Sequence, residues 1–309
     1  MIDIVVPYCT DKDVEWKNLR DKYLKEEGTT DRQATGEERY RDWDCFKYWF
    51  RCVERNCDWC NKIFLLVAST SQIPEWLDVN HPKLRIVYHE EFIPKVLLPT
   101  FNASTIELFI PNIADLSDNY IYCNDDFYFI NYLPSEAFFM DNRPVYNDAG
   151  THLVLYRDEL LNGSDGTFYK TLNNNNMQMQ LLIAGNKAKK YEIGHLPIPH
   201  KKDVENDITD EWYTHIISSQ FSSKFRHPNN LSNHVYTCLY RDLYPYIKSN
   251  VYYNSYYVTL KSDVDFDKYL DADMVCFNDT EQLDDFELTK KKLIEFFEKK
   301  FPYKSEFEV

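Results

Sequence analysis

Two adjacent carboxylates follow an apolar stretch near the middle of the chain. Residues 120–122 form an aromatic and β-branched run, which is typical of a buried strand, and Asn124, Asp125 and Asp126 come just after it. Open α/β sheets bind ligands beyond the carboxyl ends of their strands, so carboxylates here can hold a hard divalent cation, and Mg²⁺ in turn holds substrate phosphates. The alternative is an ordinary polar turn, because Asn and Asp are common turn residues.

A further acidic candidate, Glu107, lies in the stretch 98–110, which is typical of a loop entering a helix. Ser104 and Glu107 have the spacing of a capping box, in which the glutamate satisfies a backbone donor at the start of the helix. On spacing alone, that structural role is the favoured interpretation of Glu107.

Two histidines and an arginine stand in the second half of the chain. His195 and His200 lie in the stretch 194–200, where two prolines forbid a regular helix and predict a rigid loop. Arg226 belongs to a basic pair that precedes another proline. A lone loop histidine or a surface arginine is usually solvated, so these residues need a further reason to be functional.

The hydrophobic pattern predicts the scaffold that would position these residues. Strands are expected at 2–6, 63–68, 84–88, 120–123 and 274–277, the last of which runs into Asn278 and Asp279; helices are expected at 39–56, 98–110, 203–220 and 285–300. The order strand, helix, strand, strand, helix, strand favours an α/β sheet with right-handed crossovers.

The segment 130–190 is less regular and predicts loops and insertions. Residues 147–150 and the four-asparagine run 173–176 have the composition of polar loops, and a helix is expected only at 178–183. The tyrosine-rich segment 231–260 predicts a helix followed by a strand.

Composition excludes several classes of function. The chain has 309 residues, enough for one large domain, but only seven glycines, and it contains neither G-x-G-x-x-G nor a Walker A sequence. A nucleotide would therefore be held by side chains, a metal or helix N-termini. The net charge of −15 and the lack of a basic run argue against nucleic-acid binding. No apolar run reaches the roughly 18 residues that a transmembrane helix needs.

Eight cysteines are spread along the chain, and the N-terminus enters an apolar strand directly, without a signal peptide. We therefore expect a cytosolic protein with reduced thiols. Cys57 and Cys60 have the spacing of half a zinc site, but a second pair at matching spacing is absent. Buried free thiols are the favoured interpretation.

Several of these stretches, taken in order, resemble the Stealth family of bacterial capsular polysaccharide phosphotransferases. The α/β subunit of the lysosomal-enzyme N-acetylglucosamine-1-phosphotransferase also belongs to this family. The resemblance covers nearly the whole chain and lies in residues 2–6, 42–127, 195–197 with 225–227, and 276–279 with 301–308. The first region departs from the family pattern, since 7–11 lack its usual tryptophan and glycine. Lys47 replaces a usual arginine, which weakens any bidentate role there.

The resemblance implies one catalytic domain over 1–309, with a GT-A/Rossmann-like, mostly parallel sheet flanked by helices and helical additions in the C-terminal half. Residues 1–130 would form the nucleotide-sugar and metal half, and 131–309 the acceptor side. Family members move a sugar 1-phosphate from a UDP-sugar to a glycan hydroxyl and release UMP. The resemblance thus implies Mg²⁺ or Mn²⁺ as cofactor and a lipid-linked glycan as acceptor, at the cytoplasmic face of a bacterial membrane.

Phosphoryl transfer needs a metal on the diphosphate, a base for the incoming hydroxyl and cations for the transferring charge. When the family's catalytic positions are matched to this sequence, the resemblance implies that the catalytic residues are Glu107, Asp126, His195 and Arg226. Glu107 or Asp126 would orient or deprotonate the acceptor hydroxyl, and this reading of Glu107 now outweighs the capping box. His195 would serve as a base or as a hydrogen-bond donor to phosphate, and Arg226 would fork onto phosphate oxygens.

The remaining expected contacts are of two kinds. Asp125, Asp126 and Asp279 are the expected metal ligands. Residues expected to contact the uridine, the sugar or the diphosphate are Gln72, Asn102, Asn124, His200 and Asn278.

Two other functions stay open. A metal-dependent glycosyltransferase would use the same donor but attack the anomeric carbon and release UDP. A non-catalytic carbohydrate-binding or scaffold protein would explain the many aromatic residues, but not the co-occurrence of Glu107, Asp126, His195 and Arg226 at family positions.

Overall fold

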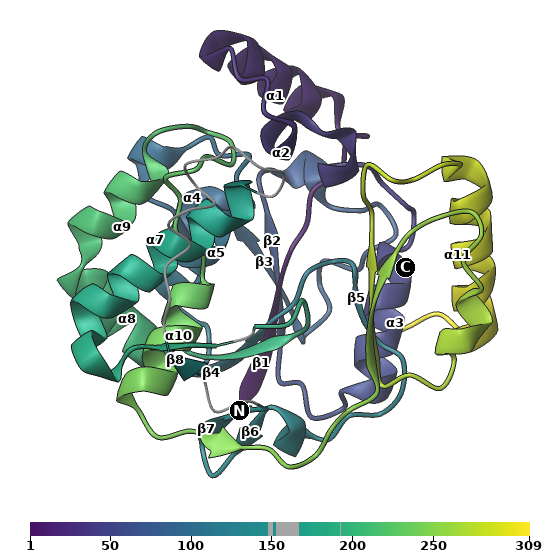
Figure 1. The fold of residues 1–309 in the computed structure, drawn as a ribbon. Coiled ribbons are helices and arrows are strands. Elements are labelled where there is room, and N and C mark those ends of the chain that lie inside the picture. The colour runs from purple at the N-terminus through teal and green to yellow at the C-terminus, as the bar shows by residue number, and fades with distance from the viewer. Residues whose placement is uncertain (148–150, 153–166, 192) are drawn as a thin grey trace.

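The computed structural model describes residues 1–147, 151–152, 167–191 and 193–309 (Figure 1). Most of the loop expected at 147–150 therefore lies outside the described residues. Among the described residues, none of the helices has both the length and the apolar character needed to cross a bilayer.

A five-stranded sheet runs through the centre of the molecule in the order β10-β4-β1-β2-β3 (Figure 1). Its strands are β1 (Ile2–Pro7), β2 (Ile63–Val67), β3 (Leu84–Tyr88), β4 (Asn119–Tyr122) and β10 (Ile198–Lys201). β1 to β4 are parallel, and β10 pairs antiparallel with β4 at the edge. The predicted mostly parallel α/β sheet is confirmed, and its order is compatible with a Rossmann-like fold. Strand order reverses between β1 and β4, where such sheets bind ligands.

Both faces of this sheet are buried, as its apolar strands require. Ile4 and Val6 of β1 pack into a core with α3 (Phe46–Asn56), whereas Val5 points to the opposite face. That face is covered by α5 (Ala103–Leu108), α8 (Lys202–Glu211), α9 (Tyr213–Gln220) and α10 (His234–Leu243). Figure 1 shows these helices on one side of the sheet and α3 on the other. The predicted helix over 203–220 is thus present as two consecutive helices.

A second, three-stranded sheet has the order β12-β13-β5 and lies on the α3 side (Figure 1). Its strands are β5 (Phe127–Phe129), β12 (Ser255–Thr259) and β13 (Met274–Asn278), and α11 (Phe286–Lys300) packs against it after the N-cap Asp285. The stretch that begins at residue 120 is therefore divided between the two sheets. Its acidic turn, 124–126, lies at their junction, and the antiparallel pairing of β13 with β5 brings residues 278–279 to the same place.

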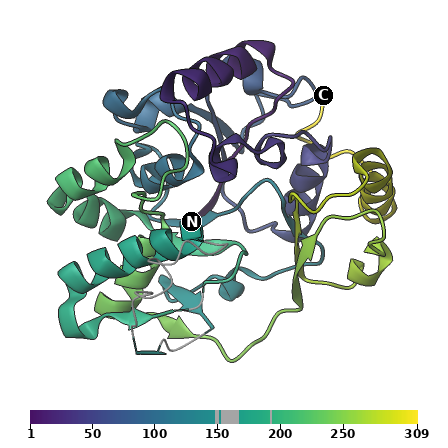
Figure 2. The same cartoon turned by 45° about the horizontal axis from the view of Figure 1, so that its top comes forward.

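Two helices lie over the end of the main sheet where β1 ends (Figure 1). Figure 2 turns this end toward the viewer. They are α1 (Val14–Glu27) and α2 (Arg32–Thr35). A small core fixes them to the rest of the molecule, made of Trp16, Ala34, Tyr40, Phe101 and Phe225.

The other elements are short, apart from one long helix, α7 (Thr167–Ala184). The strands are β6 (Phe139–Met140), β7 (Arg143–Tyr146), β8 (Thr151–His152), β9 (Lys189–Lys190) and β11 (Ile247–Lys248). The helical turns are α4 (His89–Phe92), η1 (Glu37–Arg39), η2 (Thr70–Gln72), η3 (Lys95–Leu97), η4 (Ile110–Asn112), η5 (Ser135–Ala137), η6 (Gly185–Lys187) and η7 (Phe266–Tyr269).

The helix predicted over 39–56 begins only at Phe46, so its first seven residues were assigned wrongly. Asp44 has a φ of 56°, in the left-handed region that a right-handed helix cannot accommodate. Its backbone N–H donates to the Asp42 carboxylate at 2.7 Å, which stabilises a turn in place of a helix. The turn places Asp42 beside the end of β1.

The asparagine run 173–176 was predicted as a polar loop, and this is wrong, because it lies inside α7. Asn176 and Asn174 are buried, and Asn176 exchanges two hydrogen bonds with Ser232. Tertiary contacts therefore override the weak helix propensity of asparagine.

The rigid loop predicted at 194–200 is partly wrong, because its last residues belong to β10. Pro199 is tolerated there since β10 is an edge strand, where a missing backbone donor costs no ladder bond.

Cys57 and Cys60 are buried free thiols beside α3. The interpretation as buried thiols therefore agrees with the structure.

Candidate functional site

A cavity of about 1200 Å³ opens at the carboxyl ends of β1 and β4. Its lining includes Glu107, Asn124, Asp125, Asp126, His195, Arg226, Asn278 and Asp279, which are eight of the predicted site residues. They come from α5, the 124–126 turn, the loops around 195 and 226, and the end of β13. The first 130 residues and the remainder of the chain therefore build the site together.

Carboxylates dominate the wall where the two sheets meet. The pKa of Asp125 is raised to about 8, first by burial and then by the negative charges of Asp126 and Asp42. Burial raises the pKa of Asp126 to about 6. The pKa of Asp279 is also raised to about 6 by burial, although Arg41 and Trp43 oppose the rise. Burial of these carboxyl groups, and the nearby negative charges around Asp125, cost free energy that a cation would relieve.

The donor set at this wall fits a divalent cation. Asp126 Oδ1 and Asp279 Oδ1 are buried and have no hydrogen-bond partner among the described residues. A carboxylate oxygen of Asp126, a ring nitrogen of His195 and the sulfur of Cys276 lie within 4.8 Å of one another. The Cys276 thiol donates to Asp126 Oδ2 at 3.4 Å, and burial, followed by the charge of Asp126, raises the pKa of that thiol. A protonated thiol is a poor metal ligand, which favours the carboxylates.

Glu107 faces the cavity and does not cap its helix, so the capping-box alternative is wrong. Asn102 is the N-cap of α5, and its side chain accepts from the Ser104 N–H at 3.1 Å. Glu107 Oε1 instead accepts a hydrogen bond from the Tyr122 hydroxyl at 2.8 Å. Burial raises the pKa of Glu107, while the Tyr122 hydrogen bond and the charge of Arg226 lower it. The result is a positioned carboxylate with increased basicity.

His195 is exposed to the cavity but enclosed by aromatic rings. Its imidazole meets Phe127 and Tyr257 edge to face, at centroid distances of 4.8 and 5.5 Å. Desolvation by these walls, and then the positive charges of Arg226 and Arg39, lower its pKa to about 4. The imidazole is therefore neutral at pH 7 and can accept a proton or bind a cation.

Arg226 is held in place by the packing of its neighbours. Phe225 stacks on Phe101 with a centroid distance of 5.1 Å, and the Phe101 N–H donates to the Lys224 carbonyl at 2.8 Å. Asn230 Oδ1 accepts from the His227 N–H at 2.7 Å, which closes the turn after Arg226.

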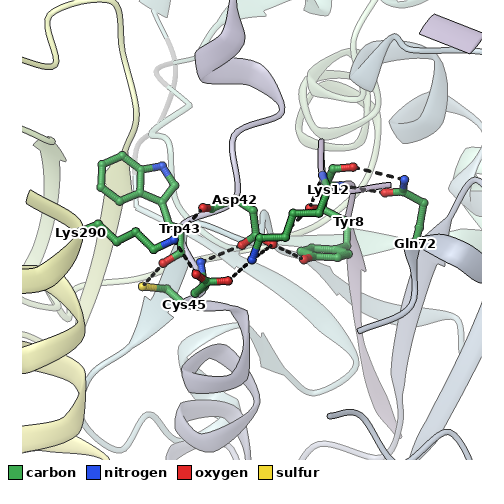
Figure 3. Close-up of polar contacts among 9 residues, drawn as sticks. Tyr8, Lys12, Asp42, Trp43, Cys45, Gln72 and Lys290 are labelled. Carbon is green, nitrogen blue, oxygen red and sulfur yellow. Dashed lines mark hydrogen bonds and ion pairs between the residues drawn. The ribbon is translucent and has the colours of Figure 1, made fainter. Parts of the chain in front are cut away.

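Asp42, which the sequence analysis did not single out as a site residue, connects three segments around the cavity (Figure 3). Its carboxylate accepts from the Thr10 hydroxyl at 3.1 Å and pairs with Lys12 at 3.2 Å, while its backbone carbonyl accepts from Lys290 at 3.4 Å. The β1–α1 loop, the 40–45 turn and α11 are thus fixed to one another. The position of Asp42 at the start of the longest stretch of family resemblance was the available signal.

Arg41 and Trp43 flank the same turn and were also missed. Arg41 lies 3.5 Å from Asp279 Oδ2, and the Trp43 indole N–H donates to that oxygen at 3.1 Å. They orient Asp279 so that its other oxygen has no partner among the described residues. Nothing in the local sequence pattern connects these residues, since the contact spans most of the chain.

Gln72, Asn102 and His200 are not part of the described cavity lining. Gln72 is buried and holds the β1–α1 loop through the backbone of Thr10 and the carboxylate of Asp13. Asn102 caps α5. Their placement favours supporting roles.

His200 is buried and lies on the edge strand β10 of the main sheet. Its Nδ1 lies 2.7 Å from a buried Glu205 oxygen, and its ring stacks on Tyr120 at 5.0 Å. These contacts also favour a supporting role.

The chain is similar in sequence to several known proteins. Residues 39–146 match conserved region 2 of the Stealth proteins. The capsular polysaccharide phosphotransferase WcwK of Streptococcus pneumoniae is 31% identical over 336 aligned residues, which cover 99% of this chain and 98% of that protein. The receptor polysaccharide phosphotransferase WefC of Streptococcus gordonii is 28% identical over 100% of this chain and 99% of its own length. A capsular polysaccharide phosphotransferase of Streptococcus thermophilus is 44% identical over 143 residues, covering 46% of this chain and 59% of that protein.

These relatives are all named phosphotransferases, which identifies the present α/β chain as a transferase. It belongs to the Stealth family, as the resemblance in its sequence predicted.

Proposed function

We propose that the chain transfers a hexose- or N-acetylhexosamine-1-phosphate from a UDP-sugar to a glycan hydroxyl, with release of UMP. The product is a phosphodiester in a capsular or cell-surface polysaccharide. One observation carries the proposal. Glu107, Asp126, His195 and Arg226, which are distant in sequence, line one cavity at the strand-order reversal of a Rossmann-like sheet. The chain also aligns over its full length with polysaccharide phosphotransferases.

The charges of the cavity suit this reaction. The acceptor oxygen attacks the phosphorus that carries the sugar, the bond from that phosphorus to the UMP oxygen breaks, and the acceptor proton passes to a base. Glu107, with its raised pKa, and neutral His195 are the two candidate bases. Arg226 supplies a planar, permanent cation for the transferring phosphate.

Asp125, Asp126 and Asp279 would hold Mg²⁺ or Mn²⁺, because hard cations prefer carboxylate oxygens and two oxygens of this set have no other partner among the described residues. When bound, the ion neutralises charge on the donor diphosphate and on the transferring phosphoryl group. The sheet would then act as a nucleotide-sugar-binding scaffold of the GT-A type within one catalytic domain. The acceptor would be a lipid-linked glycan at the cytoplasmic face of the membrane.

The test is the identity of the released nucleotide. Purified protein is incubated with UDP-glucose, UDP-galactose or UDP-N-acetylglucosamine, Mg²⁺ or Mn²⁺, and a panel of oligosaccharides. UMP, together with a phosphodiester in the product, is the expected result. Release of UDP would refute the proposal and establish a glycosyltransferase instead.

A further inference from the structure

The cavity has a second wall, which differs in chemistry from the acidic one. It is formed by α7 and the start of α10 and is lined by Asn173, Asn176, Asn233, Leu172 and Met177. This wall presents neutral amides, apolar side chains and the His234 imidazole, whereas the wall at the strand ends presents carboxylates and arginines.

Asn233 is the exceptional residue of this wall. Its side chain is 2% exposed and lines the cavity, yet neither Oδ1 nor Nδ2 has a hydrogen-bond partner among the described residues. It occupies the N-cap position of α10, where asparagine is among the most favoured residues, but its side chain makes no capping hydrogen bond. Burying an amide without partners is unfavourable, so an unpaired amide at a cavity surface indicates that a ligand completes it.

The backbone around Asn233 is fixed, so the amide is preorganised. The preceding residue, Ser232, receives a hydrogen bond from Asn176 Nδ2 at 2.8 Å and donates its N–H to Asn176 Oδ1 at 3.1 Å. The Asn233 carbonyl accepts from the Tyr236 N–H at 3.0 Å. A ligand would therefore meet this amide with little further loss of conformational freedom.

From these contacts we infer that Asn233 anchors a subsite for a neutral sugar ring, with its amide paired to two neighbouring hydroxyl groups. A carboxamide offers one donor and one acceptor, and hydroxyl groups supply both partners. Leu172 and Met177 provide apolar surface for the C–H face of a ring. A phosphate would instead favour the arginines. This inference rests on the proposed function, and the ring belongs either to the donor sugar or to the acceptor glycan.

The experiment compares Asn233→Leu with the wild-type protein by calorimetric titration. The probes are UDP, the three UDP-sugars used above, and methyl glycosides of glucose, galactose and N-acetylglucosamine added in the presence of UDP. Loss of two neutral hydrogen bonds predicts affinity for the sugar-bearing probe reduced about tenfold or more, and affinity for UDP unchanged. A loss confined to UDP-sugars identifies the donor ring, and a loss confined to glycosides identifies the acceptor ring.

Thr237→Val is the matched control. Thr237 lies one turn later on α10 and is also buried with an unpaired hydroxyl among the described residues, but it is not among the described cavity-lining residues. Its removal should leave every affinity unchanged. Asn233→Asp, which keeps the size and one acceptor, replaces Asn233→Leu if the leucine variant does not fold.

Two results would overturn the inference. One is an Asn233 variant that folds and binds every probe within twofold of wild type. The other is a wild-type protein that binds no UDP-sugar more tightly than UDP and shows no binding of any methyl glycoside in the presence of UDP. Neither depends on turnover, so release of UDP in the nucleotide assay would refute the proposed reaction while leaving the sugar subsite intact.

Discussion

The two walls of the cavity are built in different ways. The acidic wall stands on strand ends, with Asp125 and Asp126 just after β4 and Asp279 just after β13. The amide wall stands on two helices that pack on each other, α7 and α10, and its polar groups are held by contacts between distant residues. The comparison indicates a division of labour, in which strand ends concentrate charge for phosphoryl chemistry and the helices shape a neutral surface for a sugar.

The strongest test of this division removes charge from the acidic wall. Asp126→Asn keeps the size of the side chain but replaces a proposed metal ligand, so we expect kcat to fall by roughly 10³-fold or more. The measurement is UMP release at saturating donor and metal. Asp58→Asn, an exposed carboxylate elsewhere on the chain, serves as the control. Activity within tenfold of wild type would remove Asp126 from the catalytic set.

The next largest effect is expected at Glu107, which lines the cavity from α5. Glu107→Gln should lower kcat by roughly 10²- to 10⁴-fold, the usual range for loss of a general base.

Tyr122→Phe should lower kcat less than Glu107→Gln does, and it should change the dependence of kcat on pH. The Tyr122 hydroxyl stabilises the Glu107 carboxylate, so its removal raises the pKa of Glu107 further. The acidic limb of the pH–kcat profile should then move to higher pH, and an unmoved limb in the phenylalanine variant would contradict the role of Glu107 as the base.

The acidic wall also predicts how stability depends on pH and metal. The carboxyl pKa values of Asp125, Asp126 and Asp279 lie above their ordinary range, at about 8, 6 and 6, so the folded protein binds protons more tightly than the unfolded chain. Their contribution to stability is therefore present below pH 4 and is lost as pH rises through 6 to 8. Divalent cations replace these protons, so the rise in Tm on adding Mg²⁺ or Mn²⁺ should be larger at pH 8 than at pH 6.

Without added metal, the Tm of the wild-type protein should fall between pH 6 and pH 8. In Asp125→Asn this fall should be smaller, because the variant lacks the group with the highest of these pKa values. A metal-induced rise in Tm that is equal at pH 6 and pH 8 would place the ion elsewhere.

The two walls also differ in how far the sequence predicts them. Each half of the acidic wall carries a local signal: an apolar run followed by Asn124, Asp125 and Asp126 is a recognisable pattern, and the parallel strands around it were predicted closely. The amide wall depends on contacts between segments more than fifty residues apart, such as Asn176 with Ser232. Low helix propensity made 173–176 look like a loop, because nothing local shows that its amides would be buried.

The same reasoning explains the errors at single residues. Asp42 was placed inside a helix because the apolar period that includes Trp43 and Phe46 predicted one over 39–56. The left-handed backbone at Asp44 instead keeps the helix from starting before Phe46. His200 was treated as a ligand contact because it shares a proline-rich stretch with His195. Its stacking on Tyr120 depends on the pairing of β10 with β4, in which the two residues lie opposite each other, and the sequence does not reveal that pairing.

The smallest expected effect lies in the amide wall, at Asn176. Asn176→Ala leaves the buried Ser232 with two broken hydrogen bonds, at a cost of about 1–3 kcal/mol in the free energy of unfolding. Because Ser232 precedes Asn233, we expect the KM of the sugar-bearing substrate to rise a few-fold while kcat stays near wild type. Gln178→Ala, an exposed amide on the same helix, should change neither. Thermal melts with steady-state kinetics measure both effects. A fall in kcat comparable to that of Glu107→Gln would contradict the division of labour, since the helical wall would then participate in the chemistry itself.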